Sequence, residues 1–76
     1  MNKAARIIDE NKNNDFNVIA ALKKEGYKYE TENLINTIIE STYKLKVFND
    51  KNELKAEAIF RSEDATGTTL TALDWY

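Results

Sequence analysis

The N-terminal part of the chain repeats apolar residues with the period of an α-helix. Residues 3–12 predict a first helix that gathers three apolar side chains on one face: Ala4, Ala5 and Ile8. Residues 16–25 predict a second helix, because Asn14 or Asp15 can cap its start and Gly26 follows its end. The apolar face of this second helix is predicted to comprise Phe16, Ile19 and Ala20, widened by Val18 and Leu22.

A third helix is expected to begin near Thr31, whose hydroxyl can accept a hydrogen bond from the free amides of a first turn. The aliphatic residues that follow repeat at positions i, i+1, i+4 and i+5, which is typical of the buried stripe of a helix. We therefore expect this helix to bury Leu34, Ile35, Ile38 and Ile39.

The period then changes from helical to alternating, and residues 43–61 predict a β-hairpin around the polar turn of residues 49–52. A turn that is symmetric about residues 50 and 51 would pair Val47 with Leu54 and Leu45 with Ala56. Both pairs would then face the core. The predicted core-facing positions are Leu45, Val47, Leu54, Ala56, Ala58 and Phe60.

After a loop over residues 62–67, residues 68–76 predict a final strand, since β-branched and aromatic residues suit a pleated sheet. One side of this strand carries Leu73 and Trp75 and the other carries Leu70 and Ala72, and the pattern leaves open which side is buried. Trp75 accordingly either closes the core or extends an exposed docking surface. A terminal strand is expected at the edge of the sheet, where its backbone can pair with another chain.

Together these elements predict a single α+β domain over residues 1–76. Three N-terminal helices would pack on one face of a three-stranded antiparallel meander. The opposite face of the sheet would be open to water, to a second copy of the chain, or to a partner.

The composition describes an ordinary folded domain, with 42% hydrophobic and 32% charged residues among 76. No apolar stretch approaches the length of a membrane span, and the N-terminus lacks the apolar segment of a secretory signal, so a soluble cytoplasmic protein is expected. The abundant Asn, Lys and Ile residues have AT-rich codons. They suggest a low-GC genome and, with the small size, a phage or mobile-element accessory protein acting on a host protein.

The chain contains no histidine and no cysteine, which removes the usual general base, the usual thiol nucleophile and the usual zinc ligands. Carboxylate pairs remain, but each is expected to be solvated or to stabilise a helix end: Asp9/Glu10, Glu30/Glu32 and Glu63/Asp64. We therefore expect a protein that is not an enzyme and that uses no metal or cofactor.

The outward face of the predicted hairpin mixes cations with two large apolar side chains. In the predicted register Lys46 lies opposite Lys55, an unfavourable like-charge pair. The ordinary interpretation is a solvated strand face. The sharper hypothesis is a protein-binding module, such as an adaptor, regulator or inhibitor, that uses this face and the C-terminal edge strand, with another protein or a second copy as partner. Its candidate partner-binding residues are Lys44, Lys46, Phe48, Lys55, Ile59, Arg61, Trp75 and Tyr76.

The alternative function is DNA binding, because three helices followed by a hairpin have the order of a winged helix at the level of topology. The third predicted helix would then read the DNA. However, no basic residue lies between Lys28 and Lys44, although phosphate contacts normally supply most of the affinity for DNA. RNA binding through the open sheet, with Phe48 and Trp75 as stacking platforms, is a minor further option.

Overall fold

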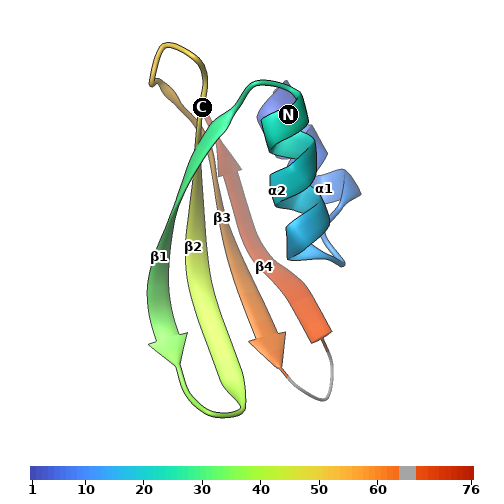
Figure 1. The fold of residues 1–76 in the computed structure, drawn as a ribbon, viewed down its shortest axis with the longest axis vertical. Coiled ribbons are helices and arrows are strands. Elements are labelled where there is room, and N and C mark those ends of the chain that lie inside the picture. The colour runs from blue at the N-terminus through green and yellow to red at the C-terminus, as the bar shows by residue number, and fades with distance from the viewer. Residues whose placement is uncertain (64–66) are drawn as a thin grey trace.

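Two helices precede a four-stranded antiparallel sheet in this computed structural model, which describes residues 1–63 and 67–76. The helices are α1 (Lys3–Glu10) and α2 (Asp15–Lys24), and they lie together on one face of the sheet (Figure 1). The strands follow one another in the order β1-β2-β3-β4. Their bounds are β1 (Lys28–Asn36), β2 (Glu40–Phe48), β3 (Leu54–Glu63) and β4 (Gly67–Trp75).

The α+β class is confirmed, but the prediction of three helices on a three-stranded meander is wrong. The segment expected to form the third helix is β1 and the turn that follows it. This strand pairs with β2 over its whole length, from Lys28 opposite Phe48 to Asn36 opposite Ser41. The pairing supplies hydrogen-bond partners that β2 would otherwise lack along that edge. The spacing of the apolar residues did not distinguish a helix from a strand here, because the end of a strand and the turn after it can carry the same i, i+1, i+4, i+5 pattern.

Asparagine side chains and one glycine set the helix ends. Asn2 caps α1 by accepting the amide of Ala5 at 2.9 Å, and Asn14 caps α2 by accepting the amides of Phe16 and Asn17, its second and third residues. Gly26 has a φ of 84°, and its amide and that of Tyr27 return to the carbonyls of the last turn of α2. The predicted capping of α2 and its termination at Gly26 are therefore confirmed.

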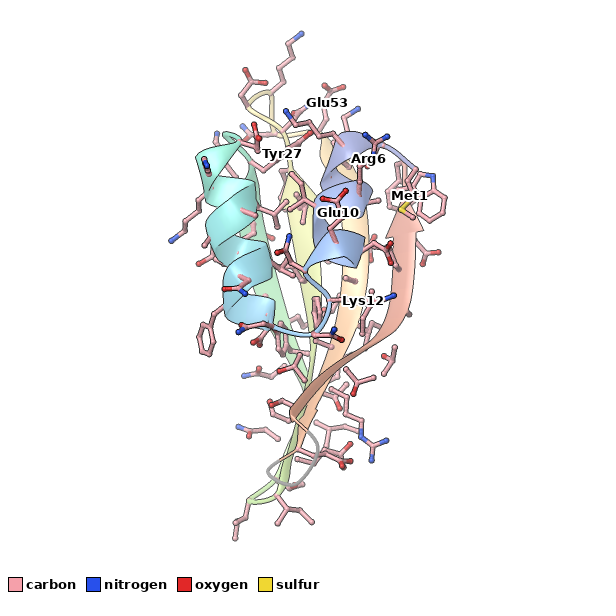
Figure 2. All side chains as sticks on the ribbon, turned by 90° about the vertical axis from the view of Figure 1, so that its right-hand side faces the viewer. Met1, Arg6, Glu10, Lys12, Tyr27 and Glu53 are labelled. Atoms are coloured by element: carbon pink, nitrogen blue, oxygen red, sulfur yellow. The ribbon has the colours of Figure 1, made fainter. Side chains whose placement is uncertain are left out.

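The core lies between the two helices and one face of the sheet. Helix α1 buries the predicted Ala4, Ala5 and Ile8, together with Ile7, which the prediction did not include. On α2 the buried residues are Val18 and Leu22. The predicted row of Phe16, Ile19 and Ala20 is wrong, because Phe16 is 80% exposed, Ala20 is exposed and Ile19 is only half-buried. The charged residues of α1 lie on its outer side, where Arg6 and Glu10 project away from the sheet (Figure 2).

The hairpin of β2 and β3 is confirmed, but its register differs from the prediction by two residues. Val47 pairs with Ala56 and Leu45 pairs with Ala58. The turn is longer than expected, because the Asn49 side chain accepts the amides of Lys51 and Glu53 at 2.9 Å each and so organises a five-residue loop. A shift of two keeps the core-facing residues from Ala56 onwards on their predicted face, whereas the pairing is irregular after Val47, so that Leu54 lies opposite Phe48. The buried residues are Leu45, Val47, Ala56, Ala58 and Phe60, and Leu54 is half-buried.

A β-bulge at Thr71 makes each of the two alternatives for the final strand partly correct, because one leucine from each of them packs against the core. Leu73 pairs with Ala58 and Leu70 pairs with Phe60, so the pairing skips one residue of β4 between them. Because of that extra residue, Leu70 and Leu73 lie on the same face of the sheet although they are three positions apart in the sequence. Leu70 and Leu73 both pack against the core as a result. Residues 64–66, which include Asp64 and fall within the predicted loop, lie outside the described part of the chain.

Candidate functional site

The most distinctive surface of the protein is the end of the β1–β2 hairpin. Four aliphatic side chains are exposed there: Leu34 by 46%, Ile35 by 47%, Ile38 by 98% and Ile39 by 70%. We call these four residues the hairpin tip. The helices cover only the opposite half of the sheet, so the hairpin extends beyond them (Figures 1 and 2). The prediction that these four residues form a buried helical stripe is therefore wrong.

The turn itself has an unusual sequence for a tight connection. Its central residues are Ile38 and Ile39, whereas two-residue hairpin turns favour Gly, Asn and Asp. Both isoleucines keep a negative φ, a backbone conformation that branched residues adopt without strain. Their side chains nevertheless add nothing to the core, because both are exposed. The tip is thus an apolar feature that packing of the core does not require.

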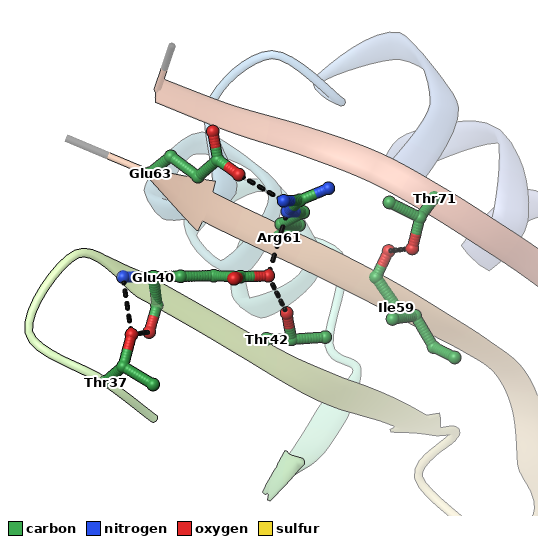
Figure 3. Close-up of polar contacts among 7 residues, drawn as sticks. All are labelled: Thr37, Glu40, Thr42, Ile59, Arg61, Glu63 and Thr71. Carbon is green, nitrogen blue, oxygen red and sulfur yellow. Dashed lines mark hydrogen bonds and ion pairs between the residues drawn. The ribbon is translucent and has the colours of Figure 1, made fainter. Parts of the chain in front are cut away.

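Polar contacts hold the turn in place from both sides (Figure 3). The amide of Thr37 donates to the carbonyl of Glu40 at 2.8 Å. The Thr37 hydroxyl also donates to that carbonyl at 3.1 Å and accepts the Glu40 amide at 3.0 Å. On the neighbouring strand, Arg61 forms an ion pair with the Glu40 carboxylate at 2.9 Å and a second ion pair with Glu63. These contacts fix the backbone on which the two isoleucines are displayed.

The open face of the sheet, on the side away from the helices, carries a balanced charge pattern. Lys46 pairs with Glu30 on β1 and with Glu57 on β3, and not with Lys55. The predicted like-charge pair is therefore wrong, because the register places opposite charges beside each other. Lys44 contacts the carboxylate of Glu57 at 3.7 Å. The cations expected to meet an acidic partner are thus largely matched by carboxylates of the same sheet.

The apolar candidates on this face lie apart from one another. Ile59 is half-buried on β3, opposite Lys44. Phe48 is also half-buried and lines a shallow hollow of about 320 Å³ at the sheet end opposite the tip, together with Lys28, Tyr29, Glu30 and Asn52. The open face therefore brings Lys44, Lys46, Ile59 and Arg61 onto one surface, with Phe48 at its far end.

The C-terminal candidates are anchored to the rest of the fold. Trp75 pairs with Ala56 and lies on the helix side of β4, 47% exposed. The amide of Tyr76 donates to the carbonyl of Lys55 at 3.1 Å, and its hydroxyl donates to Glu57 at 3.2 Å. The side chain of Asn2 donates to the backbone oxygens of both Lys55 and Tyr76. Trp75 and Tyr76 consequently point to opposite faces and do not form one docking surface.

The sequence contained a signal that identifies the tip. The residues before it alternate Tyr29, Thr31 and Asn33 with charged residues, which is a strand pattern. Two adjacent isoleucines then stand between the polar pairs Asn36–Thr37 and Glu40–Ser41, as in a short turn. With β1 assigned as a strand, the winged-helix alternative loses the helix that it requires for reading DNA.

Comparisons with protein-family models, with curated proteins and with solved structures found no match to this chain. Within residues 1–63 and 67–76, acidic side chains nowhere form a group of three that could hold a metal ion. In the same part of the chain, neither helix is long and apolar enough to cross a membrane.

Proposed function

We propose that this protein is a small non-enzymatic protein-binding module, of the adaptor, regulator or inhibitor type, whose principal contact surface is the hairpin tip. The observation that carries the proposal is the pair of isoleucines at the centre of a tight turn, one of them 98% exposed. An exposed apolar cluster of this kind costs solubility and marks interaction sites on soluble domains.

The construction of the turn supports this function. Thr37 closes the turn, and Arg61 holds Glu40 below it. A binding loop that is already ordered loses less conformational entropy on association than a flexible one. The apolar side chains are therefore presented in a fixed arrangement, which favours recognition over non-specific association.

The proposed contact surface lies at one end of the sheet and includes only part of the surface predicted from the sequence. Of the candidates on the open face, Arg61 lies next to the tip, and Lys44 and Ile59 follow further along the sheet, where they would belong to a polar rim around an apolar centre. Lys46 lies nearer the other end of the sheet, opposite Glu30 and Glu57, and has no role in this contact. Phe48, Lys55, Trp75 and Tyr76 lie towards the other end of the sheet and have no role in this contact.

Site-specific photo-cross-linking tests the proposed function. A photo-reactive phenylalanine analogue replaces Ile38 at the tip, and the matched control carries it at Lys51 in the β2–β3 turn at the other end of the sheet. The variants are expressed in a low-GC bacterial host, and each cross-linked protein is identified, purified and measured for direct binding. We expect a partner that cross-links from position 38 alone and binds the unmodified chain with a micromolar or lower dissociation constant.

Two results would contradict the proposed function. The first is the same set of cross-linked proteins from both positions, which indicates non-specific collision. The second is a partner whose affinity is unchanged by the double substitution Ile38→Ala/Ile39→Ala. Truncating true anchor residues costs more than about 2 kcal/mol, which is roughly a 30-fold loss of affinity.

A further inference from the structure

We infer that the hairpin tip fits a concave apolar groove on a different protein, and that Lys or Arg residues line the rim of that groove. This inference rests on the proposed function and specifies the partner of the same site. It follows from the shape of the hairpin, from the area that the tip offers, and from the charges around it.

The shape of the tip favours a concave partner. The molecule measures 36 Å along its longest axis and 20 Å and 19 Å across, and the β1–β2 hairpin forms one end of the long axis (Figure 1). The turn residues Ile38 and Ile39 are the most exposed of the four aliphatic residues. A narrow, convex apolar feature is desolvated on all sides only when a groove surrounds it.

The available area argues against a second copy as the occupant. The exposed fractions of the four tip residues together equal fewer than three fully exposed aliphatic residues. A stable interface takes about 800 Å² and 20–30 residues from each partner. Two convex tips in contact would bury much less than this. A groove, in contrast, also covers the flanking residues of β1 and β2.

The sheet edges do not supply the missing area for a symmetric dimer. The pairing of β1 with β2 skips Leu34, and the pairing of β4 with β3 skips Thr71, so each outer strand carries a bulge. Bulges on outer strands interrupt the regular backbone edge that a second copy would extend. Continuous strand addition along either edge is therefore disfavoured.

The charges at this end of the sheet specify the rim. Residues 31–42 contain two carboxylates, Glu32 and Glu40, and no cation. Arg61, the cation that reaches the turn, is shared between Glu40 and Glu63, and Lys44 lies opposite Glu32. The three carboxylates at this end of the described structure therefore outnumber its two cations, so that two copies, or an anionic lipid surface, would be repelled. A cationic rim complements it.

The test uses the purified partner obtained by cross-linking from position 38. Its affinity and association rate are measured with the wild-type chain, with Glu32→Lys beside the tip, and with Asp50→Lys in the distant β2–β3 turn. Both substitutions change the net charge equally. Since Glu32→Lys opposes Lys44, the milder Glu32→Gln variant and a thermal melt of each protein control for folding.

We expect Glu32→Lys to weaken binding about fivefold to tenfold at low salt (about 50 mM), mainly through the association rate. Glu32→Gln is expected to have a smaller effect in the same direction, and Asp50→Lys less than a twofold effect. At about 500 mM salt the three affinities should converge with that of the wild type, because screening removes rim electrostatics.

Several outcomes would overturn this inference, and the first two leave the proposed function intact. Equal effects of Glu32→Lys and Asp50→Lys would exclude a cationic rim next to the tip. A wild-type dimer in light scattering that Ile38→Asp dissociates would identify a second copy as the occupant. Co-sedimentation with phosphatidylcholine vesicles that is lost in Ile38→Asp would instead identify a lipid surface as the occupant of the tip, and would contradict the proposed function as well. If no partner cross-links from position 38, the proposed function itself fails, and this inference fails with it.

Discussion

The hydroxyl of Tyr43 on β2 donates a 2.6 Å hydrogen bond to Oδ2 of Asp15, the first residue of α2. The Tyr43 ring stacks on Phe60, with 5.7 Å between ring centroids and 27° between the ring planes. One side chain therefore joins the start of α2 to the buried centre of β3. The contact fixes how the second helix lies on the sheet.

Replacing Tyr43 with Phe should destabilise the fold by about 1–2 kcal/mol, because the hydrogen bond is to a carboxylate and is partly buried. Urea denaturation followed by circular dichroism measures the change. A double-mutant cycle with Asp15→Ala isolates the pair, and we expect a coupling energy of about 1 kcal/mol. Strictly additive single substitutions would mean that the hydrogen bond does not contribute to stability.

Tyr43 should also make the stability of the protein depend on alkaline pH. Burial raises the pKa of Tyr43 above its usual range, and the hydrogen bond to Asp15 and the charge of that carboxylate raise the pKa further. The folded state therefore holds the phenolic proton more tightly than the unfolded state does. The resulting stabilisation is complete below about pH 10, the pKa in the unfolded chain, and is lost as pH rises above it.

The free energy of unfolding of the wild type and of Tyr43→Phe, measured from pH 8 to pH 11.5, checks this prediction. The difference between the two proteins should be constant up to about pH 10 and should shrink above it. Since the two proteins differ only at position 43, the difference reports the contribution of the Tyr43 hydroxyl. A difference that grows with pH would have the wrong sign for this environment.

Deleting Thr71 should be tolerated, because it removes the bulge without moving a core residue. Leu70 and Leu73 would then stand two positions apart, the regular spacing of side chains on one face, and both would keep their partners on β3. We expect a loss of at most about 1 kcal/mol. Thr71→Ala removes only the exposed hydrogen bond of Oγ1 to the Ile59 carbonyl and should also cost at most about 1 kcal/mol. A melting temperature of the deletion variant far below that of Thr71→Ala would show that the bulge itself stabilises the sheet.

The two functions of Asn2 can be separated by substitution. Asn2→Asp keeps an oxygen to cap α1 but removes the donor that serves the backbone oxygens of Lys55 and Tyr76, whereas Asn2→Ala removes both. We expect Asn2→Ala to cost about 1–2 kcal/mol and Asn2→Asp less. Hydrogen exchange at the Tyr76 amide should accelerate in both variants. An Asp variant as unstable as the Ala variant would show that the cap contributes nothing.

Two isoleucines provide a direct comparison of the tip with the core. Ile38 is 98% exposed and Ile8 is fully buried. Ile38→Ala should change the free energy of unfolding by no more than about 0.5 kcal/mol, whereas Ile8→Ala should cost about 2–5 kcal/mol. Chemical denaturation of both variants checks the contrast. A large loss of stability for Ile38→Ala would mean that the tip belongs to the fold and not to a binding surface.

Local chemistry in the sequence determined the elements whose signals are short-range. The start of α2 follows from Asn14 and its end from Gly26, because a side-chain acceptor and a positive φ act within one turn of the helix. The alternation from residue 43 onwards determined which residues of β2 and β3 are buried, since side chains on a strand point to alternate faces. The C-terminal strand was identified by its β-branched residues in the same way.

Only the tertiary structure decided the secondary structure of residues 28–39 and the pairing of the strands in the sheet. Leu34, Ile35, Ile38 and Ile39 fit a buried helix as well as an exposed hairpin, and the available partner, the edge of β2, selected the strand. The register of Lys46 and the bulge at Thr71 likewise depend on how neighbouring strands meet. The exposure of the four aliphatic side chains therefore follows from strand pairing in the folded chain, because their spacing in the sequence is equally compatible with a helix.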